Sequence, residues 1–170
     1  MEKLKKSRLY LMCGIAGSGK STWIANHKKC FQGSVKVISR DAIRFSLLKE
    51  GDEYFSKEKE CWKEFVAQAK ASLAENDNTI LDATHLNDRS RGRILNQLGE
   101  SLKDVSINAI VLDTGADTAI AQNANRTGRA FVPPIAIREM QADFKVPTLD
   151  EGFDAIYVYR NGKCTVHVKE

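Results

Sequence analysis

The sequence lacks long hydrophobic runs and is poor in the residues that break or cross-link a fold. No apolar stretch approaches the ~20 residues that a membrane-spanning helix needs. Only 3 of the 170 residues are proline, and the 4 cysteines form no Cys-x-x-Cys pair. These absences argue against a membrane protein, a collagen-like chain and a zinc-stapled domain. We expect free thiols, packed as small hydrophobic residues in a reducing compartment, at Cys13, Cys30, Cys61 and Cys164.

Length and charge narrow the possibilities further. A chain of 170 residues has room for a single domain, residues 1–170. Its 26 basic and 22 acidic side chains give a net charge of +4, which permits a polyanionic partner without demanding one. Four of residues 1–6 are charged and no apolar segment follows them, so we expect no secretory signal and a cytoplasmic location.

Strand and helix signals alternate along the chain, which predicts an α/β fold with helices on both faces of a parallel sheet. Strands are expected at 8–13, 35–39, 79–82 and 105–112. Helices are expected from near Asp41, from near Ser56, at 88–98, at 117–126 and from Pro134. Spacings of three and four in the second of these helices predict a buried stripe of Trp62, Phe65, Val66, Ala69 and Leu73.

Two loops stand out in the second half of the sequence. Residues 126–134 break all periodicity between two expected helices, as a mobile lid would, and end in Pro133-Pro134. Asn161-Gly162 lies between β-type runs at 155–159 and 165–168, which predicts a C-terminal β-hairpin.

The first strand leads directly into a phosphate-binding pattern, GxxxxGK[ST], with Thr22 after it. Glycines let successive backbone N–H groups point at phosphate oxygens, and the following helix adds the positive end of its dipole. A glycine turn that only caps a helix is a much weaker interpretation, because strand and helix signals flank the pattern. The loop comprises Gly14, Ile15, Ala16, Gly17, Ser18, Gly19, Lys20 and Ser21.

The pattern predicts a nucleotide and a metal. Lys20 would neutralise the β- and γ-phosphates, and the Ser21 hydroxyl would complete the octahedral shell of Mg²⁺. No Asn-Lys-x-Asp segment of the kind that recognises guanine is present, so ATP is the expected nucleotide.

An acid and a base follow the second strand, in Ser39-Arg40-Asp41-Ala42-Ile43-Arg44. Asp41 and Arg44 are three residues apart at a helix start and therefore share a face. Asp41 could accept the proton of an attacking hydroxyl while Arg44 holds an anion of the acceptor. Alternatively, Asp41 caps the helix and Arg44 is a solvated neighbour.

Further candidates lie at other strand ends and in the lid. Asp82 and Asp113 each follow a strand, and we favour Asp82 as the magnesium partner because its strand should lie beside the first. His85 is left without a role.

Arginines in the lid and on one helix are the remaining cationic candidates. Arg126 and Arg129 could stabilise charge on the transferring phosphoryl group, or could simply be solvated. Arg89, Arg91 and Arg93 crowd one helix and could meet a nucleic-acid backbone, although a solvated helix face is at least as good an interpretation.

The ordered set of motifs resembles the P-loop kinase domain of the phage and bacterial polynucleotide 5′-hydroxyl kinases. The resemblance covers residues 8–157 and is carried by the segments GIAGSGKST, ISRDAIR, ILDATHLN, LDT, NANRTGRAFVPP and PTLDEGFD. It implies transfer of the ATP γ-phosphate to the 5′-OH end of DNA or RNA. It also implies that Asp41 is the general base, that Arg44 grips the acceptor's neighbouring phosphate, and that Arg126 contacts the donor phosphates.

This sequence departs from the family pattern in the lid. Members commonly carry a second arginine four residues before the lid arginine, where this chain has Gln122, so donor binding should be weaker unless Arg129 compensates. A kinase for a small-molecule hydroxyl (a sugar, a nucleoside or an antibiotic) and a nucleotide-dependent switch without transfer activity are the alternative hypotheses.

Overall fold

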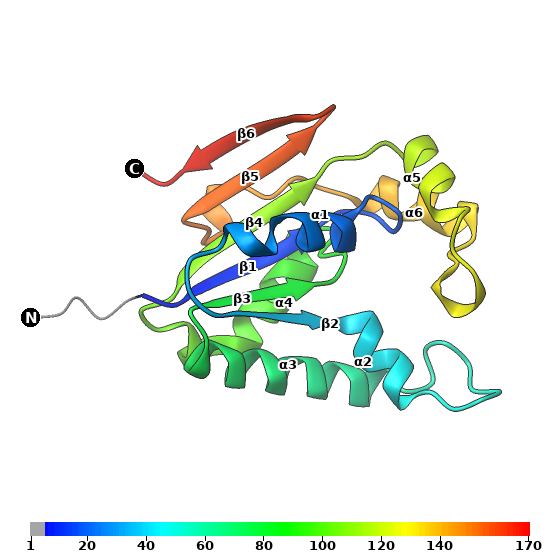
Figure 1. Cartoon of the computed structure of the whole chain (residues 1–170), viewed down its shortest axis with the longest axis horizontal. Helices are drawn as coiled ribbons and strands as arrows, with labels where there is room; N and C mark the ends of the chain where they lie inside the picture. The colour runs from blue at the N-terminus through cyan, green and yellow to red at the C-terminus, as the bar shows by residue number, and fades with distance from the viewer. Residues whose placement is uncertain (1–5) are drawn as a thin grey trace, which may run out of the picture.

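The computed structural model describes residues 6–170; the segment 1–5, from which the absence of a secretory signal was inferred, lies outside the described residues. Six strands form one sheet in the order β2-β3-β1-β4-β5-β6, parallel except for β6 (Figure 1). This confirms the predicted α/β class. The strands are β1 (Arg8–Cys13), β2 (Val35–Ser39), β3 (Asn78–Asp82), β4 (Ser106–Leu112), β5 (Ala155–Arg160) and β6 (Lys163–Val168).

Helices cover the sheet unequally. On one face lie α3 (Glu58–Glu75) and α4 (Asp88–Leu98), while α1 (Lys20–His27) lies on the other (Figure 1). Three more helices gather near the carboxyl ends of the parallel strands: α2 (Arg40–Leu47), α5 (Ala116–Asn123) and α6 (Pro134–Asp143). Within the described residues no helix is long and apolar enough to cross a membrane.

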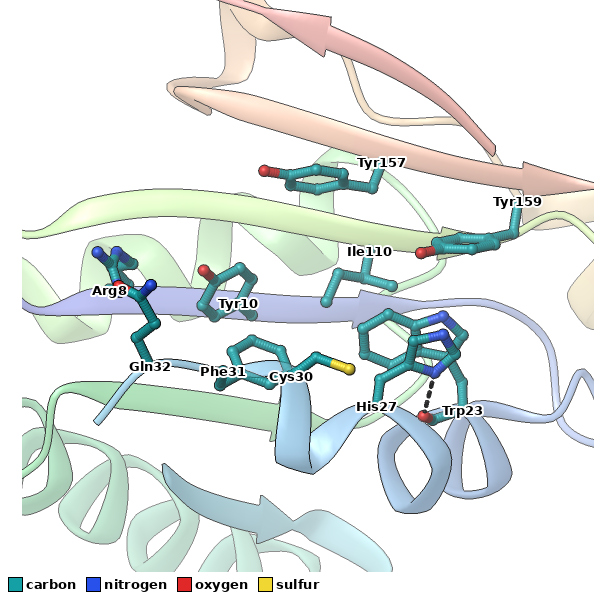
Figure 2. Close-up of a pocket in the computed structure, with 10 residues that line it drawn as sticks. All are labelled: Arg8, Tyr10, Trp23, His27, Cys30, Phe31, Gln32, Ile110, Tyr157 and Tyr159. Carbon is teal, nitrogen blue, oxygen red and sulfur yellow. Dashed lines mark hydrogen bonds between the residues drawn. The ribbon is translucent and has the colours of Figure 1, made fainter. Parts of the chain in front are cut away.

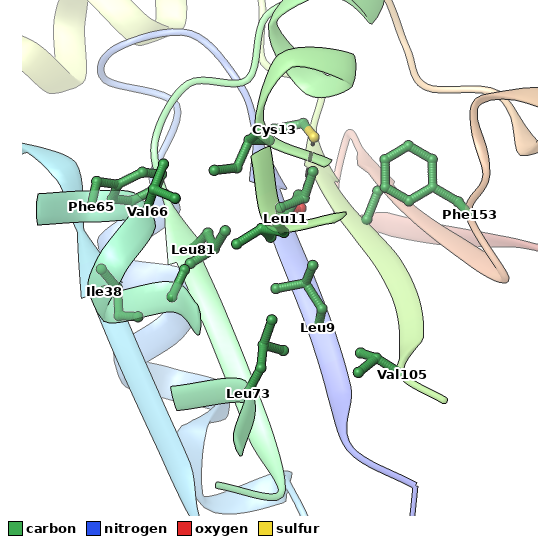
Figure 3. Close-up of a cluster of buried hydrophobic side chains, with 14 of the residues drawn as sticks. Leu9, Leu11, Cys13, Ile38, Phe65, Val66, Leu73, Leu81, Val105 and Phe153 are labelled. Atoms are coloured by element: carbon green, nitrogen blue, oxygen red, sulfur yellow. Dashed lines mark hydrogen bonds between the residues drawn. The ribbon is translucent and has the colours of Figure 1, made fainter. Parts of the chain in front are cut away.

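The alternation of side chains along β1 divides the core in two. Leu9 and Leu11 face α3 and α4 in the larger cluster (Figure 3), whereas Met12 packs with Ile24 of α1 on the opposite face. This period of two is what a central strand buried on both faces requires.

The buried stripe predicted for α3 is correct at four of its five positions. Phe65, Val66, Ala69 and Leu73 are buried. The prediction is wrong for Trp62, which is only partly buried; the Arg93 guanidinium lies over its ring, 4.0 Å from the centroid.

The helix expected at 117–126 ends earlier, at Asn123. The buried Asn123 amide donates to the Val132 carbonyl at 2.7 Å and accepts from the Val132 N–H at 3.2 Å, so the chain is clamped there. The predicted lid therefore lies between α5 and α6, with its two ends joined at its base.

The C-terminal hairpin is confirmed, and its turn explains the sequence. Asn161 and Gly162 have φ angles of 50° and 74°, the left-handed region that an Asn-Gly hairpin turn needs. The expectation of buried thiols is correct for Cys13 and Cys61 and wrong for Cys30 and Cys164, which are exposed.

Candidate active site

The loop between β1 and α1 has the shape that its glycines require. Gly17 and Gly19 have φ angles of 79° and 96°, and a Cβ on Gly17 would stand 2.3 Å from the Ala119 carbonyl oxygen. Gly19 is the N-cap of α1, so the first N–H groups of that helix face the loop. The Ser18 hydroxyl is buried and has no partner among the described residues, as expected for a loop shaped to enclose a ligand.

Lys20 spans this loop. Its ammonium donates to the carbonyl oxygens of Gly14 at 2.9 Å and Ile15 at 3.0 Å. Burial lowers the pKa of Lys20 to about 8, and Arg126 also acts to lower it, whereas the charge of Asp82 acts to raise it. The structure therefore holds this cation ready beside the loop that would receive phosphate.

Ser21 and Asp82 meet because β3 lies next to β1, as the sequence predicted. The Ser21 hydroxyl donates to Asp82 Oδ2 at 3.1 Å. Burial raises the pKa of Asp82, although Lys20 and the Ser21 hydrogen bond oppose this. Asp113 instead accepts a hydrogen bond from Arg160 at 2.7 Å.

Two oxygen-bearing side chains fit Mg²⁺, which commonly takes one or two protein ligands and completes its shell with phosphate and water. No group of three His, Cys, Asp or Glu suited to a metal occurs among residues 6–170. The donors present therefore match a metal bound together with a nucleotide better than a metal held by the protein alone.

The turn after β3 is hydrogen-bonded to the start of the phosphate loop and to the end of β1. The Gly14 N–H donates to the Thr84 carbonyl at 2.9 Å, and His85 Nδ1 lies 2.6 Å from the Met12 carbonyl oxygen. Burial lowers the pKa of His85 to about 4, so the ring is neutral and Nδ1 donates this bond. His85 is therefore a buried support of the loop.

Asp41 lies across the cleft from the phosphate loop, in the first turn of α2. The helix cap is Ser39, whose hydroxyl accepts from the Ala42 N–H, so the interpretation of Asp41 as a cap is wrong. Asp41 Oδ1 accepts a hydrogen bond from the Tyr54 hydroxyl at 2.9 Å and pairs with Arg44. No described residue donates to its second oxygen, Oδ2.

Arg44 is buried, which contradicts its interpretation as a solvated neighbour. Glu58 of α3 receives Nη2 at 2.9 Å and Nε at 3.1 Å, and Arg40 pairs with the same carboxylate. Burial alone would raise the pKa of Glu58, but the Arg44 hydrogen bonds and the charge of Arg40 lower it. Glu58 therefore stays ionised and fixes the plane of the Arg44 guanidinium.

Two members of this acceptor-side network, Tyr54 and Glu58, were missed by the sequence reasoning. They lie 10 and 14 residues from Arg44, too far for a helical spacing to reveal them. The only available signal was general: a buried arginine needs a carboxylate partner. Burial raises the pKa of Tyr54 to about 12, and the charge of Asp41 adds to this, so the hydroxyl stays protonated.

A cavity of about 880 Å³ joins the predicted residues from both sides. Lys20, Ser21 and Asp82 line one wall, Asp41 and Arg44 another, and the lid residue Arg126 a third. The side chain of Arg129 lies outside the described part of the structure. The structure thus brings six of the predicted polar residues to one cavity, whereas the predicted nucleotide-binding residues Ser18 and Thr22 do not line it.

The structure contradicts, for Arg91, the interpretation that the arginines of α4 could meet a nucleic-acid backbone. Arg91 is fully buried and donates to Glu151 at 2.7 Å and to the backbone carbonyls of His85 and Lys145 at 2.9 Å each. It cannot meet a nucleic-acid backbone, because its N–H groups are used inside the protein. Arg89 and Arg93 remain exposed.

An AAA domain family model matches residues 9–147. The chain belongs to this family of P-loop kinase domains. Membership implies nucleotide binding with a metal and suggests a phosphotransferase. Among curated proteins, none matches the chain.

Solved structures share the fold at low identity. A chain of the Pnkp1/Rnl/Hen1 RNA repair complex has a TM-score of 0.64 and 23% identity, over 84% of this chain and 45% of that one. The PezAT toxin–antitoxin system of Streptococcus pneumoniae gives 0.70 and 18%, over 94% and 70%. A gluconokinase from Sinorhizobium meliloti 1021 gives 0.51 and 16%, over 85% and 77%. The chain spans less than half of the Pnkp1 complex chains that it matches.

Proposed function

We propose that this protein is an ATP-dependent polynucleotide 5′-hydroxyl kinase acting on DNA or RNA. The Asp41–Arg44 pair, in one cavity with the phosphate loop and Arg126, carries the proposal. A base beside an anion-binding arginine is what a hydroxyl flanked by a phosphodiester requires. The similarity to a chain of an RNA repair complex supports this acceptor class.

In this mechanism the acceptor 5′-oxygen bonds to the γ-phosphorus as the bond from that phosphorus to the bridging oxygen breaks, which releases ADP. Asp41 takes the hydroxyl proton on Oδ2, since Oδ1 accepts the hydrogen bond of Tyr54. Lys20 and Arg126 stabilise the negative charge of the transferring group. Mg²⁺, held through Ser21 and Asp82, would neutralise phosphate charge.

Arg44 has to change partners for this role. In the free protein its N–H groups are used by Glu58, Asp41 and Tyr54. We infer that the acceptor phosphate replaces the contacts at Nη1, while Glu58 keeps Nε and Nη2 in place. A charge-assisted bond to phosphate would then offset the loss of the two contacts at Nη1, to Asp41 and Tyr54.

A small-molecule kinase is the second candidate, favoured by the gluconokinase likeness, which spans 77% of that chain. The cavity holds three carboxylates, of Asp41, Glu58 and Asp82. Four cations face them in the same cavity, namely Lys20, Arg40, Arg44 and Arg126. The excess of one positive charge favours a polynucleotide acceptor, and the small-molecule kinase stays the second candidate.

The deciding experiment incubates the protein with γ-labelled ATP, Mg²⁺ and matched 5′-OH and 5′-phosphate oligonucleotides of DNA and RNA. Label should enter the 5′-OH strands alone. Asp41→Asn should reduce the rate by about 10²–10⁴-fold and retain ATP binding, whereas Lys20→Ala should damage both.

The surface variant Asp117→Asn, on a side chain that is 90% exposed, is the matched control. Unlabelled 5′-OH strands despite ATP binding would overturn the acceptor class and turn attention to small hydroxyl compounds. Equal loss of ATP binding in Asp41→Asn and Lys20→Ala would contradict the base assignment. A protein that binds ATP and functions unchanged without Asp41 would be a nucleotide switch.

A further inference from the structure

A second cavity lies on the sheet face that carries α1, away from the catalytic residues. This aromatic groove has a volume of about 410 Å³ (Figure 2). Its floor comes from β1, β4 and β5 and its side from α1 and the following turn, η1 (Lys28–Cys30). The residues that matter here are Tyr10, Trp23, Phe31, Tyr157, Tyr159 and Arg8.

Six aromatic rings meet in this groove, and all of them are partly exposed; the sixth is the imidazole of His27, which stacks on one face of Trp23 with centroids 4.2 Å apart. Tyr10 and Phe31 pack edge to face with centroids 5.0 Å apart, and Trp23 meets Tyr159 in the same manner at 5.7 Å. They remain open because α1 crosses this face without reaching over β5 (Figure 1). Rings of this kind offer flat surfaces on which nucleobases stack.

The cations around the groove are unpaired. Arg8 lies at the end toward which the Tyr10 and Tyr157 hydroxyls point (Figure 2). Lys28 and Lys29 are exposed on η1, between the lining residues His27 and Cys30. Within the described residues, none of these three cations forms an ion pair.

We propose that the aromatic groove binds single-stranded nucleic acid, with bases stacked on the tyrosine and tryptophan rings and phosphates held by Arg8, Lys28 and Lys29. Partly exposed rings on a β-sheet beside unpaired cations supply both components that such binding needs. The inference goes beyond the proposed kinase activity, because it concerns a different face and needs no phosphoryl transfer.

A second copy of the chain is the competing occupant. The edge strand β6 is exposed along its whole length, and Val166 and Val168 extend the apolar surface beside Tyr157 and Ala155. Clustered positive charge favours the nucleic acid, since two identical copies would bring Lys28 and Lys29 toward like charges.

The test measures fluorescence anisotropy of a 5′-phosphorylated, 3′-labelled single strand of about ten nucleotides, without ATP. The 5′-phosphate prevents it from serving as an acceptor. Tyr157→Ala should weaken binding about tenfold, within the range for loss of one stacked base. Lys28→Ala/Lys29→Ala should make the slope of log affinity against log salt shallower by about 1.4.

The matched control is Lys63→Ala/Lys70→Ala, which removes the same charge from exposed positions of α3 on the opposite face. In a Trp62→Phe background Trp23 is the remaining tryptophan, so stacking should quench its emission. Thermal unfolding shows whether Tyr157→Ala has lost its fold. If it has, the salt dependence of binding by Lys28→Ala/Lys29→Ala still tests the inference.

Three results would overturn the inference: no binding, binding that is equal in the groove and control variants, or a concentration-dependent dimer that Tyr157→Ala abolishes. Groove-dependent binding by a protein that never labels 5′-OH ends would uphold this inference while the proposed function fails.

Discussion

The two sides of the catalytic cleft are built in different ways. The donor side is one continuous stretch, residues 14–22, whose backbone makes the site and whose lysine returns to its own loop carbonyls. The acceptor side is a side-chain network from three segments, in which Asp41 and Arg44 of α2 meet Tyr54 of a loop and Glu58 of α3.

This difference separates what is shared from what is specific. A backbone cradle binds phosphates whatever the reaction, so the donor side identifies the family and leaves the acceptor open. Side chains that converge from distant segments can be exchanged one at a time, so under the proposed function they would determine which hydroxyl is phosphorylated. Perturbing each side separately should give separable effects on stability, acceptor use and ATP binding.

The largest expected effect concerns the anchor of the donor side, His85. Its pKa of about 4 lies below the unfolded value near 6.5, so the unfolded chain binds more protons between these limits. The free energy of unfolding should fall by about 3 kcal/mol as the pH drops from 6.5 to 4. Chemical denaturation across this range measures it.

A replacement that cannot titrate should flatten this dependence. Asn can donate to the Met12 carbonyl and tolerates the φ of 40° found at His85, so His85→Asn is the informative variant. His167→Asn, at an exposed position, is the control and should keep the slope. An unchanged slope in His85→Asn would assign the acid sensitivity to other groups.

On the acceptor side, Glu58→Gln should cost about 2 kcal/mol of stability, because it leaves the buried Arg44 charge without its main partner. The freed guanidinium should also lower kcat/KM for the acceptor about tenfold while the Kd for ATP stays unchanged. Steady-state kinetics and ATP titration measure both effects. Glu60→Gln, exposed on the same helix, is the control, and an equal change in ATP affinity would show that the two sides are not separable.

The contrast between the two sides also explains which features could be predicted from the sequence and which could not. The parallel α/β sheet, the loop at 126–134 between two helices and the placement of the Asp82 strand beside the first strand followed from local motifs and from the rules for parallel sheets. The pairing of Arg44 with Glu58 did not, because it depends on how α3 docks against α2. Sequence spacing describes one helix at a time.

Charged residues were the least predictable part of the fold. Arg91 has the same letter as its exposed neighbours Arg89 and Arg93, but its position on the inner face of α4 buries it against Glu151. Trp62 of α3 likewise has a partner that its own helix does not reveal, since the guanidinium over its ring belongs to Arg93 of α4. In both cases a contact between two elements overrides the pattern within one.

A smaller effect is expected on ATP affinity when the pH is raised, because Lys20 on the donor side loses its charge. With a pKa of about 8, Lys20 loses its charge as the pH rises from about 7 to about 9, and ATP affinity should fall about tenfold. Titration calorimetry in buffers of different ionisation enthalpy should also detect proton uptake on binding near pH 8. Lys20→Arg keeps the charge and should remove the dependence; a dependence that persists would point to another group.

The smallest expected effect tests whether the donor side lacks a cation that would strengthen ATP binding. Gln122 lies on the last turn of α5, four residues before Arg126, and is exposed. Gln122→Arg would restore the arginine that the resemblance to polynucleotide kinases places four residues before Arg126, and it should tighten ATP binding about threefold, as suits one exposed ion pair. Asn125→Arg, which adds the same charge at another exposed position, is the control. Tighter ATP binding in Gln122→Arg alone would mean that the missing arginine weakens ATP binding in this protein. Equally tight binding in both variants would mean that the added positive charge acts without regard to its position.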